Sequence, residues 1–191
     1  MATVRKGNKG VLLIVDVQVG VMSGSWEAPR IIQNVSRVVG QARAHGVPVL
    51  WVQHSDQELP YGSAEWELPP DLVPVKGEPV IHKQFNSAFE QTLLEQELAH
   101  LGATHIVLAG AATNWCIRAT AYGALDRGYD LTLVKDAHTT GTVELENGTK
   151  IEAANIIDEL NMVMTWVSYP GRTSGTATVD EVDFDSLGGA G

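Results

Sequence analysis

Three residues with complementary chemistry are spread along the chain: the acid Asp16, the amine Lys83 and the only cysteine, Cys116. A free thiol has a pKa of about 8.5, so a nucleophilic cysteine needs a base that accepts its proton or a positive charge that stabilises the thiolate. Asp16 could accept the proton, and Lys83 could supply the charge. Together the three could perform nucleophilic acyl transfer at a carbonyl carbon.

Each of these residues also has a simpler interpretation. A single cysteine in a helix behind a buried strand is more often a small core residue than a nucleophile. Asp16 by itself could cap a turn or a helix, and Lys83 by itself could be a surface charge. The catalytic interpretation therefore requires the fold to bring the three side chains together, because they lie far apart in the sequence.

Apolar runs separated by helical patterns indicate an α/β sheet. The strands that they predict lie at 11–15, 47–52, 79–82, 105–109, 130–135 and 162–166. The helices that the spacing of apolar residues predicts lie at 29–45, 87–101, 114–127 and 151–160. Nearly all the strands are continuously apolar, which is typical of strands buried on both faces of a parallel sheet with right-handed crossovers.

The predicted strands bring the three candidate residues to one edge of that sheet. Asp16 follows the first strand, Lys83 follows the third, and Cys116 lies in the first turn of the helix after the fourth. Open α/β sheets bind ligands at the carboxyl ends of their strands. The unpaired amides of a first helical turn favour an anion and could hold an oxyanion, and the small residues at 110–112 would let a substrate carbonyl approach the backbone.

Three segments resemble the isochorismatase-like cysteine hydrolases, a family that includes nicotinamidases, N-carbamoylsarcosine amidases, ureidoacrylate amidohydrolases and isochorismatases. They are LLIVDVQ at 12–18, HKQFNSAF at 82–89 and the block at 108–140 that begins LAGAATNWC. The last block is the most specific, because a strand, a G-x-x-T-x-x-C turn, a helix and a D-A-H follow in the family's order. The resemblance implies a Rossmann-like α/β three-layer sandwich with a central, mainly parallel sheet of about six strands.

The resemblance also implies a catalytic triad of Asp16, Lys83 and Cys116. It further implies a cis peptide between Ala111 and Ala112, with the backbone amides of Ala112 and Cys116 as an oxyanion hole. In the family's mechanism the acid accepts the thiol proton, the lysine supports the thiolate, and the cysteine attacks an amide or ureide carbonyl. The implied activity is hydrolysis of a C–N bond in a small amide, ureide or lactam through a thioester.

Two alternative functions remain open. An isochorismatase-type hydrolase would cleave an enol ether with Asp16 as the proton donor, and it would not need the thiol of Cys116. A non-catalytic oligomeric scaffold on the same fold would have no activity to lose. Replacement of Cys116 separates the three, because only the first function depends on the sulfur.

Other side chains are candidates for contact with a substrate. Gln18 lies two residues after Asp16, so both face the same side if the extended chain continues, and Gln18 could orient a water or the substrate. Phe89 and Trp115 could line the pocket, since aromatic side chains are usual in such pockets.

The histidines near the predicted site have other roles in this interpretation. His82 is a neighbour of Lys83 on a strand, so it should face away from the site and pack elsewhere. We interpret His138 as a brace for its loop. The nicotinamidase branch carries a metal-binding acid and paired histidines after the second strand. Here that loop offers His54 and Asp56 but no second histidine before His82, so we expect no metal, and we expect no cofactor.

Length and composition predict a single domain over residues 1–170. Residues 171–191 are rich in Gly, Thr, Ser and Asp and predict an extended tail or an oligomerisation arm. The chain has 13 Lys and Arg against 23 Asp and Glu, a net charge of −10, which argues against nucleic acid as a partner.

The remaining expectations concern location and assembly. No apolar run approaches the roughly 20 residues that a membrane span needs, and the N-terminal segment lacks the pattern of a signal peptide. A single cysteine excludes an internal disulfide and fits a reducing compartment, so we expect a cytoplasmic protein that does not bind a membrane. The family resemblance further suggests a homo-oligomer, a dimer, tetramer or larger, acting on a small-molecule substrate.

Overall fold

The apolar run near the N-terminus forms a central strand of a parallel sheet. In the structure, a computed structural model that describes residues 2–188, β1 (Gly10–Val15) pairs with β2 (Val49–His54) on one side and with β4 (His105–Ala111) on the other. Alternate side chains of β1 enter two different hydrophobic clusters, one on each face of the sheet. The strand is therefore covered on both faces, as its unbroken apolar sequence predicts.

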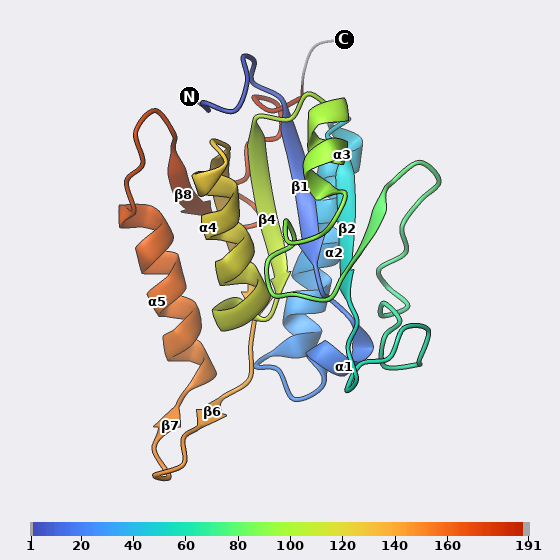
Figure 1. The fold of residues 1–191 in the computed structure, drawn as a ribbon, viewed down its shortest axis with the longest axis vertical. Coiled ribbons are helices and arrows are strands. Elements are labelled where there is room, and N and C mark those ends of the chain that lie inside the picture. Colours follow the sequence, from blue (N-terminus) through green and yellow to red (C-terminus); the bar gives the residue numbers. More distant parts are fainter. Residues whose placement is uncertain (1, 189–191) are drawn as a thin grey trace.

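The six strands of this sheet lie in the order β3-β2-β1-β4-β5-β8, and all neighbours run parallel (Figure 1). The three further strands are β3 (Val80–Lys83), β5 (Asp130–Thr139) and β8 (Ser174–Ala177). From β1 the chain adds strands outward to β3 and then returns to the other side of β1 with β4. The strand order thus reverses between β1 and β4, the point at which open α/β sheets bind ligands.

Helices cover both faces of the sheet, which confirms the predicted three-layer α/β fold (Figure 1). One face packs against α2 (Ala28–Ala44), whose apolar stripe is buried. The other face packs against α3 (Leu94–His100), α4 (Arg118–Asp126) and α5 (Ala153–Trp166). No helix within residues 2–188 has both the length and the apolar character that crossing a membrane would require.

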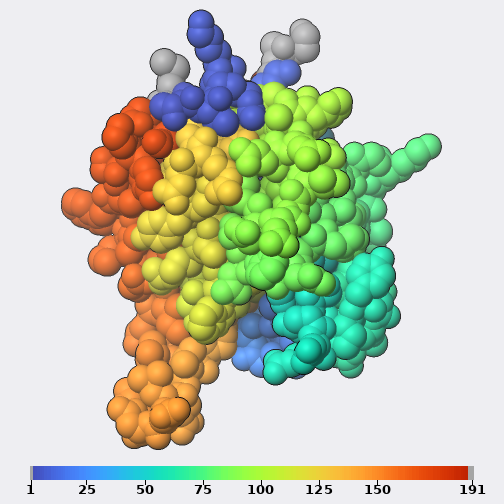
Figure 2. All heavy atoms as spheres, in the orientation of Figure 1, coloured from blue at the N-terminus to red at the C-terminus, as the bar shows by residue number. Residues whose placement is uncertain are grey.

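Short elements complete the chain. They are the helix α1 (Val19–Met22), the π-helical turn η1 (Thr113–Ile117) and the paired strands β6 (Val143–Glu144) and β7 (Lys150–Ile151). The β6–β7 hairpin, drawn in orange, projects from the body of the molecule in Figures 1 and 2.

The predicted strand at 162–166 is wrong, because these residues form the last turns of α5. A short apolar run cannot be assigned to a strand or a buried helix by periodicity alone. The sixth strand is β8, whose sequence SGTA has no large apolar residue. It lies at the edge of the sheet next to β5, where a strand needs little apolar surface.

The prediction of an extended tail or arm after residue 170 also needs correction. This segment contributes β8 to the sheet, and Val179, Phe184 and Leu187 are buried in the cluster on the α2 face. The amide of Gly10 donates a hydrogen bond to the carbonyl of Leu187 at 2.9 Å. A few spaced apolar residues are therefore enough to dock the segment onto the domain. Residues 189–191 of the predicted tail lie outside the described part of the chain.

Candidate active site

The structure brings Asp16, Lys83 and Cys116 together at the carboxyl edge of the sheet. The Nζ atom of Lys83 lies 2.6 Å from Oδ2 of Asp16 and 3.2 Å from Sγ of Cys116. All three side chains are buried. An acid, an ammonium and a thiol in direct contact, with little access to water, form a group in which each charge affects the others.

The backbone at the strand-order reversal explains how Asp16 and Cys116 approach each other. Asp16 directly follows β1 and lies in the left-handed region with φ +52°, a conformation that Asp tolerates better than most residues. Gly110, near the end of β4, has φ +129°, and a Cβ there would lie 1.9 Å from the carbonyl oxygen of Val15. Only glycine therefore fits where the ends of β1 and β4 meet. Just after Gly110, the peptide bond between Ala111 and Ala112 is cis. Cys116 follows in η1.

Lys83 reaches this point from β3, two strands away from β1. Its ammonium contacts two further acceptors, the backbone carbonyl of Phe85 at 3.1 Å and Nδ1 of His54 at 3.4 Å. In the sheet register, Lys83 is the partner of His54 on β2, so their side chains leave the sheet side by side. Four acceptors thus surround one ammonium group.

The electrostatics of the site favour a shared proton. Burial raises the pKa of Asp16, although the charge of Lys83 and its hydrogen bond oppose this shift. Burial and the charge of Asp16 raise the pKa of the Cys116 thiol to about 12, against the opposing charge of Lys83. One ammonium can balance one anion, so the two acidic groups together retain one proton. Transfer of that proton from sulfur to carboxylate leaves the net charge of the site unchanged.

Gln18, predicted to orient a water or the substrate, has a different role. Its Nε2 donates to the carbonyls of His54 at 3.0 Å and Trp66 at 2.8 Å, and its Oε1 accepts from the amide of His54 at 2.8 Å. The side chain is fully buried and both ends of its amide are engaged with backbone. Gln18 therefore ties the segment after β1 to the end of β2 and to Trp66, which lies in the loop that connects β2 with β3.

The two aromatic candidates lie in different environments. Phe89 is buried, its ring 6.1 Å from that of Tyr129, with the guanidinium of Arg127 4.6 Å from its ring centroid. It belongs to the core and packs against α4 rather than facing an open pocket. Trp115 precedes Cys116 in η1 and is 57% exposed at the surface. Contact between Trp115 and a substrate stays a prediction.

His138 forms a closed hydrogen-bonded network behind the turn that carries Cys116. Nδ1 of His138 lies 2.9 Å from the hydroxyl of Thr113, and Nε2 lies 3.0 Å from Oδ1 of Asn161, whose amide donates to the carbonyl of Lys135. Because Asn161 donates with its nitrogen, its oxygen accepts from Nε2–H, and Nδ1 accepts from Thr113. Burial lowers the pKa of His138 to about 4, so the ring is neutral at neutral pH. This network braces its loop, as the sequence predicted.

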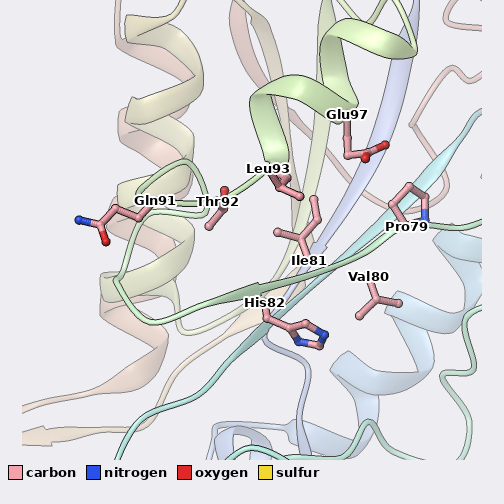
Figure 3. Close-up of a pocket in the computed structure, with 8 residues that line it drawn as sticks. All are labelled: Pro79, Val80, Ile81, His82, Gln91, Thr92, Leu93 and Glu97. Atoms are coloured by element: carbon pink, nitrogen blue, oxygen red, sulfur yellow. The ribbon is translucent and has the colours of Figure 1, made fainter.

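Two hollows lie near β3. A small one of about 220 Å³ reaches Lys83, and its lining residues are Ser55, His82, Lys83, Gln84, Phe85 and Gln91. Figure 3 shows a larger one of about 530 Å³, lined by residues of β3 and of 91–97, to which none of the three candidate catalytic residues contributes. The exposed His82 packs against the rings of Tyr61 and Trp66. Of the two, only the small hollow has a candidate catalytic residue, Lys83, in its lining, and the Lys83 side chain itself is fully buried.

One residue of the site was not identified from the sequence. From the sequence, His54 was considered only as a possible metal ligand, yet its ring contacts Lys83 and forms a 2.9 Å hydrogen bond with Asp56. His54 lies at the end of β2, and Lys83 lies at the end of the neighbouring strand β3. These two positions were the signal that could have identified His54 as a residue of the site. Within residues 2–188 no three or more His, Cys, Asp or Glu side chains are grouped as a metal site would need.

Comparison with known proteins gives a consistent result. The family model described as the isochorismatase domain matches residues 10–167. A streptothricin hydrolase of Streptomyces noursei is 34% identical over 137 residues, which are 68% of this chain and 54% of that protein. The ureidoacrylate amidohydrolase of Methylobacterium radiotolerans is 28% identical over 177 residues, covering 70% and 69%. The chain therefore spans about half the length of the streptothricin hydrolase that it matches.

Solved structures show the same fold. The crystal structure of an isochorismatase from Pseudomonas putida KT2440 superposes with a TM-score of 0.81. The two sequences are 27% identical, and the match covers 91% of this chain and 89% of that one. The similarity thus extends over almost the whole chain.

Proposed function

Because the chain belongs to the isochorismatase family of hydrolases, we propose that it is a cysteine amidohydrolase that cleaves a C–N bond of a small amide, ureide or lactam. The observation that carries this proposal is the direct contact of the Lys83 ammonium with both the carboxylate of Asp16 and the sulfur of Cys116. Enol ether cleavage with an acid as the proton donor would not require a sulfur at that position.

The proposed reaction begins with proton transfer from the thiol to Asp16 as the sulfur attacks the carbonyl carbon. A carbon–sulfur bond forms, and the carbonyl oxygen becomes an oxyanion. When the C–N bond breaks, the leaving nitrogen takes the proton from Asp16 and a thioester remains on Cys116. Water then gives a proton to Asp16 and attacks the thioester, which releases the acid and restores the thiol.

Lys83 stabilises this sequence without exchanging a proton. Its positive charge offsets whichever of Asp16 and Cys116 carries the negative charge, so proton transfer between them costs little in the buried site. The backbone amides of Ala112 and Cys116, at the start of η1, would hold the oxyanion. Amides in a first helical turn have no partner within the helix and are available for this role.

The relatives support a hydrolase of small molecules. Two of the similar proteins are named as a streptothricin hydrolase and a ureidoacrylate amidohydrolase. The small hollow that Lys83 helps to line has a volume of about 220 Å³, which suits a compact substrate. Assembly into a homo-oligomer and a cytoplasmic location stay predictions.

The test is a screen of amides, carbamoyl compounds and cyclic ureides for release of ammonia or amine. Wild-type protein should turn over at least one class, and Cys116→Ala should lower turnover by roughly 10⁴-fold because no nucleophile remains. Rapid quenching of the active reaction should show an acyl adduct by intact-mass spectrometry. Since the chain has one cysteine, absence of that adduct from Cys116→Ala locates it.

The same variant separates the alternatives. An enol ether hydrolase would keep most of its activity in Cys116→Ala, and a scaffold would show no turnover of any substrate in the wild type. Circular dichroism and thermal unfolding of both proteins serve as the control that the substitution leaves the fold intact. Retained amide hydrolysis by folded Cys116→Ala would contradict the proposal.

A further inference from the structure

His54 is a partly buried neighbour of the proposed triad that the mechanism above does not use. Its Nδ1 lies 3.4 Å from Nζ of Lys83, and its Nε2 lies 2.9 Å from Oδ2 of Asp56. The ring thus connects the inner ammonium to a carboxylate that is half exposed. The His54 backbone is held in place by Gln18, which binds both its amide and its carbonyl.

The partners of Asp56 determine where the proton of His54 resides. Oδ1 of Asp56 accepts the backbone amides of Glu58 at 2.9 Å and Leu59 at 2.8 Å, and the hydrogen bond from His54 lowers the pKa of this carboxyl further. An ionised carboxylate only accepts, so Nε2 of His54 carries the hydrogen. In the neutral ring Nδ1 then has a free lone pair, and this lone pair faces the ammonium of Lys83.

The ammonium has fewer hydrogens than acceptors. Lys83 offers three N–H groups. The carboxylate of Asp16 and the carbonyl of Phe85 are the closest acceptors at 2.6 and 3.1 Å, which leaves the third hydrogen for either Cys116 at 3.2 Å or His54 at 3.4 Å. A neutral thiol is a weak acceptor, whereas an imidazole nitrogen is a good one and a thiolate is better still.

We propose that His54 is a positioning residue that restrains Cys116 through Lys83. While the sulfur is a thiol, the third ammonium hydrogen bonds to Nδ1 of His54, and it moves to the sulfur when the thiolate forms. Breaking the bond to His54 is then part of the cost of making the nucleophile. The inference rests on the proposed function, since it assigns His54 a role only in the reactivity of this triad.

Alkylation by iodoacetamide tests this restraint without knowledge of the substrate. The Cys116 sulfur forms a bond to the reagent's methylene carbon, iodide leaves, and the thiol proton passes to Asp16. With one cysteine in the chain, the rate follows directly from the intact mass of the folded protein. His54→Leu removes the competing acceptor, so Cys116 should be alkylated about three- to tenfold faster than in wild type, the range that one net hydrogen bond supports.

Two further variants separate loss of the acceptor from loss of the ring. His54→Asn places Oδ1 near the position of Nδ1 and should restore the wild-type rate within about twofold. Asp56→Asn keeps the acceptor for the turn amides but presents N–H to Nε2, so the ring proton must move to Nδ1. This variant should therefore be alkylated faster, like His54→Leu, although it leaves His54 in place.

A double-mutant cycle excludes simple loosening of the site. In a Lys83→Met background there is no ammonium hydrogen to compete for, so adding His54→Leu should not change the rate. An equal acceleration in both backgrounds, or no acceleration in wild type, would overturn the inference. His105→Leu, which removes a partly buried histidine bonded to Thr132 at the far end of β4, is the matched control and should react like wild type.

The alkylation rates also distinguish failure of the proposed function from failure of the role proposed for His54. If Asp16→Asn and Lys83→Met are alkylated as fast as the wild type, the triad does not activate Cys116 and the amidohydrolase proposal loses its basis. If these two variants are slowed but His54→Leu is not accelerated, the triad stands and only the role of His54 is rejected.

Discussion

Two buried polar networks lie at the same edge of the sheet and differ in how their hydrogen bonds are matched. In the network of Thr113, His138 and Asn161, each ring nitrogen of His138 has one hydrogen-bond partner, and the ring is neutral. Around Lys83, four acceptors compete for three hydrogens, and two acidic groups share one positive charge. A matched network has one arrangement and stabilises the fold. A mismatched one has several arrangements, and that allows a proton to move.

The largest effect should come from Asp16→Asn, which removes the proton acceptor from the mismatched network. Asn also tolerates the left-handed backbone of this position, so the substitution should not strain the end of β1. Loss of a general base lowers turnover by about 10²- to 10⁴-fold. The measurement is kcat/KM on the substrate found in the screen, with the unfolding curve as control. Activity within tenfold of wild type would show that Asp16 is not the base.

The next largest effect should come from His138→Leu, which breaks the matched network. The buried Thr113 hydroxyl and the Asn161 carbonyl oxygen then have lost their partner, and the cost in unfolding free energy at pH 7 should be about 2–4 kcal/mol. Urea unfolding measures it. A change below about 0.5 kcal/mol would show that the network does not stabilise the fold.

The pH dependence of stability sharpens that result. His138 has a pKa of about 4 in the folded chain against 6.5 when unfolded. Between these values the unfolded chain binds more protons, so the contribution of this group to stability is complete above pH 6.5 and is lost as the pH falls towards 4. His138→Leu should lack this contribution, so its stability should fall less than that of wild type over the same interval.

The smallest effect should be the fall of kcat/KM at acid pH, the acid limb of the pH profile. It reports on the mismatched network alone. Asp16 and Cys116 share one proton, so kcat/KM should be level through neutral pH and fall about tenfold per unit once the pair binds a second proton. Burial raises the pKa of Asp16, so this limb should lie above 3.8. A limb at or below 3.8, measured where urea curves show folded protein, would contradict the shared proton.

The sequence by itself determined the type of sheet and the three residues of the proposed triad. Unbroken apolar runs such as that of β1 specify strands buried on both faces, and strand ends in a parallel sheet meet at one edge. Asp16, Lys83 and Cys116 could therefore be placed together from chain order alone. The same logic failed where local composition and tertiary role differ, as in β8, which is a strand because β5 offers it an open edge.

Only the tertiary structure decided what each polar side chain in the site contacts. Gln18 carries the same amide whether it binds a substrate or a backbone, and its burial against the end of β2 settles the choice. His54 became part of the site through its register with Lys83 and its bond to Asp56. Hydrogen-bond matching depends on distances of a few tenths of an ångström between residues far apart in sequence. Residue type and spacing therefore name the reacting groups, and packing sets their reactivity.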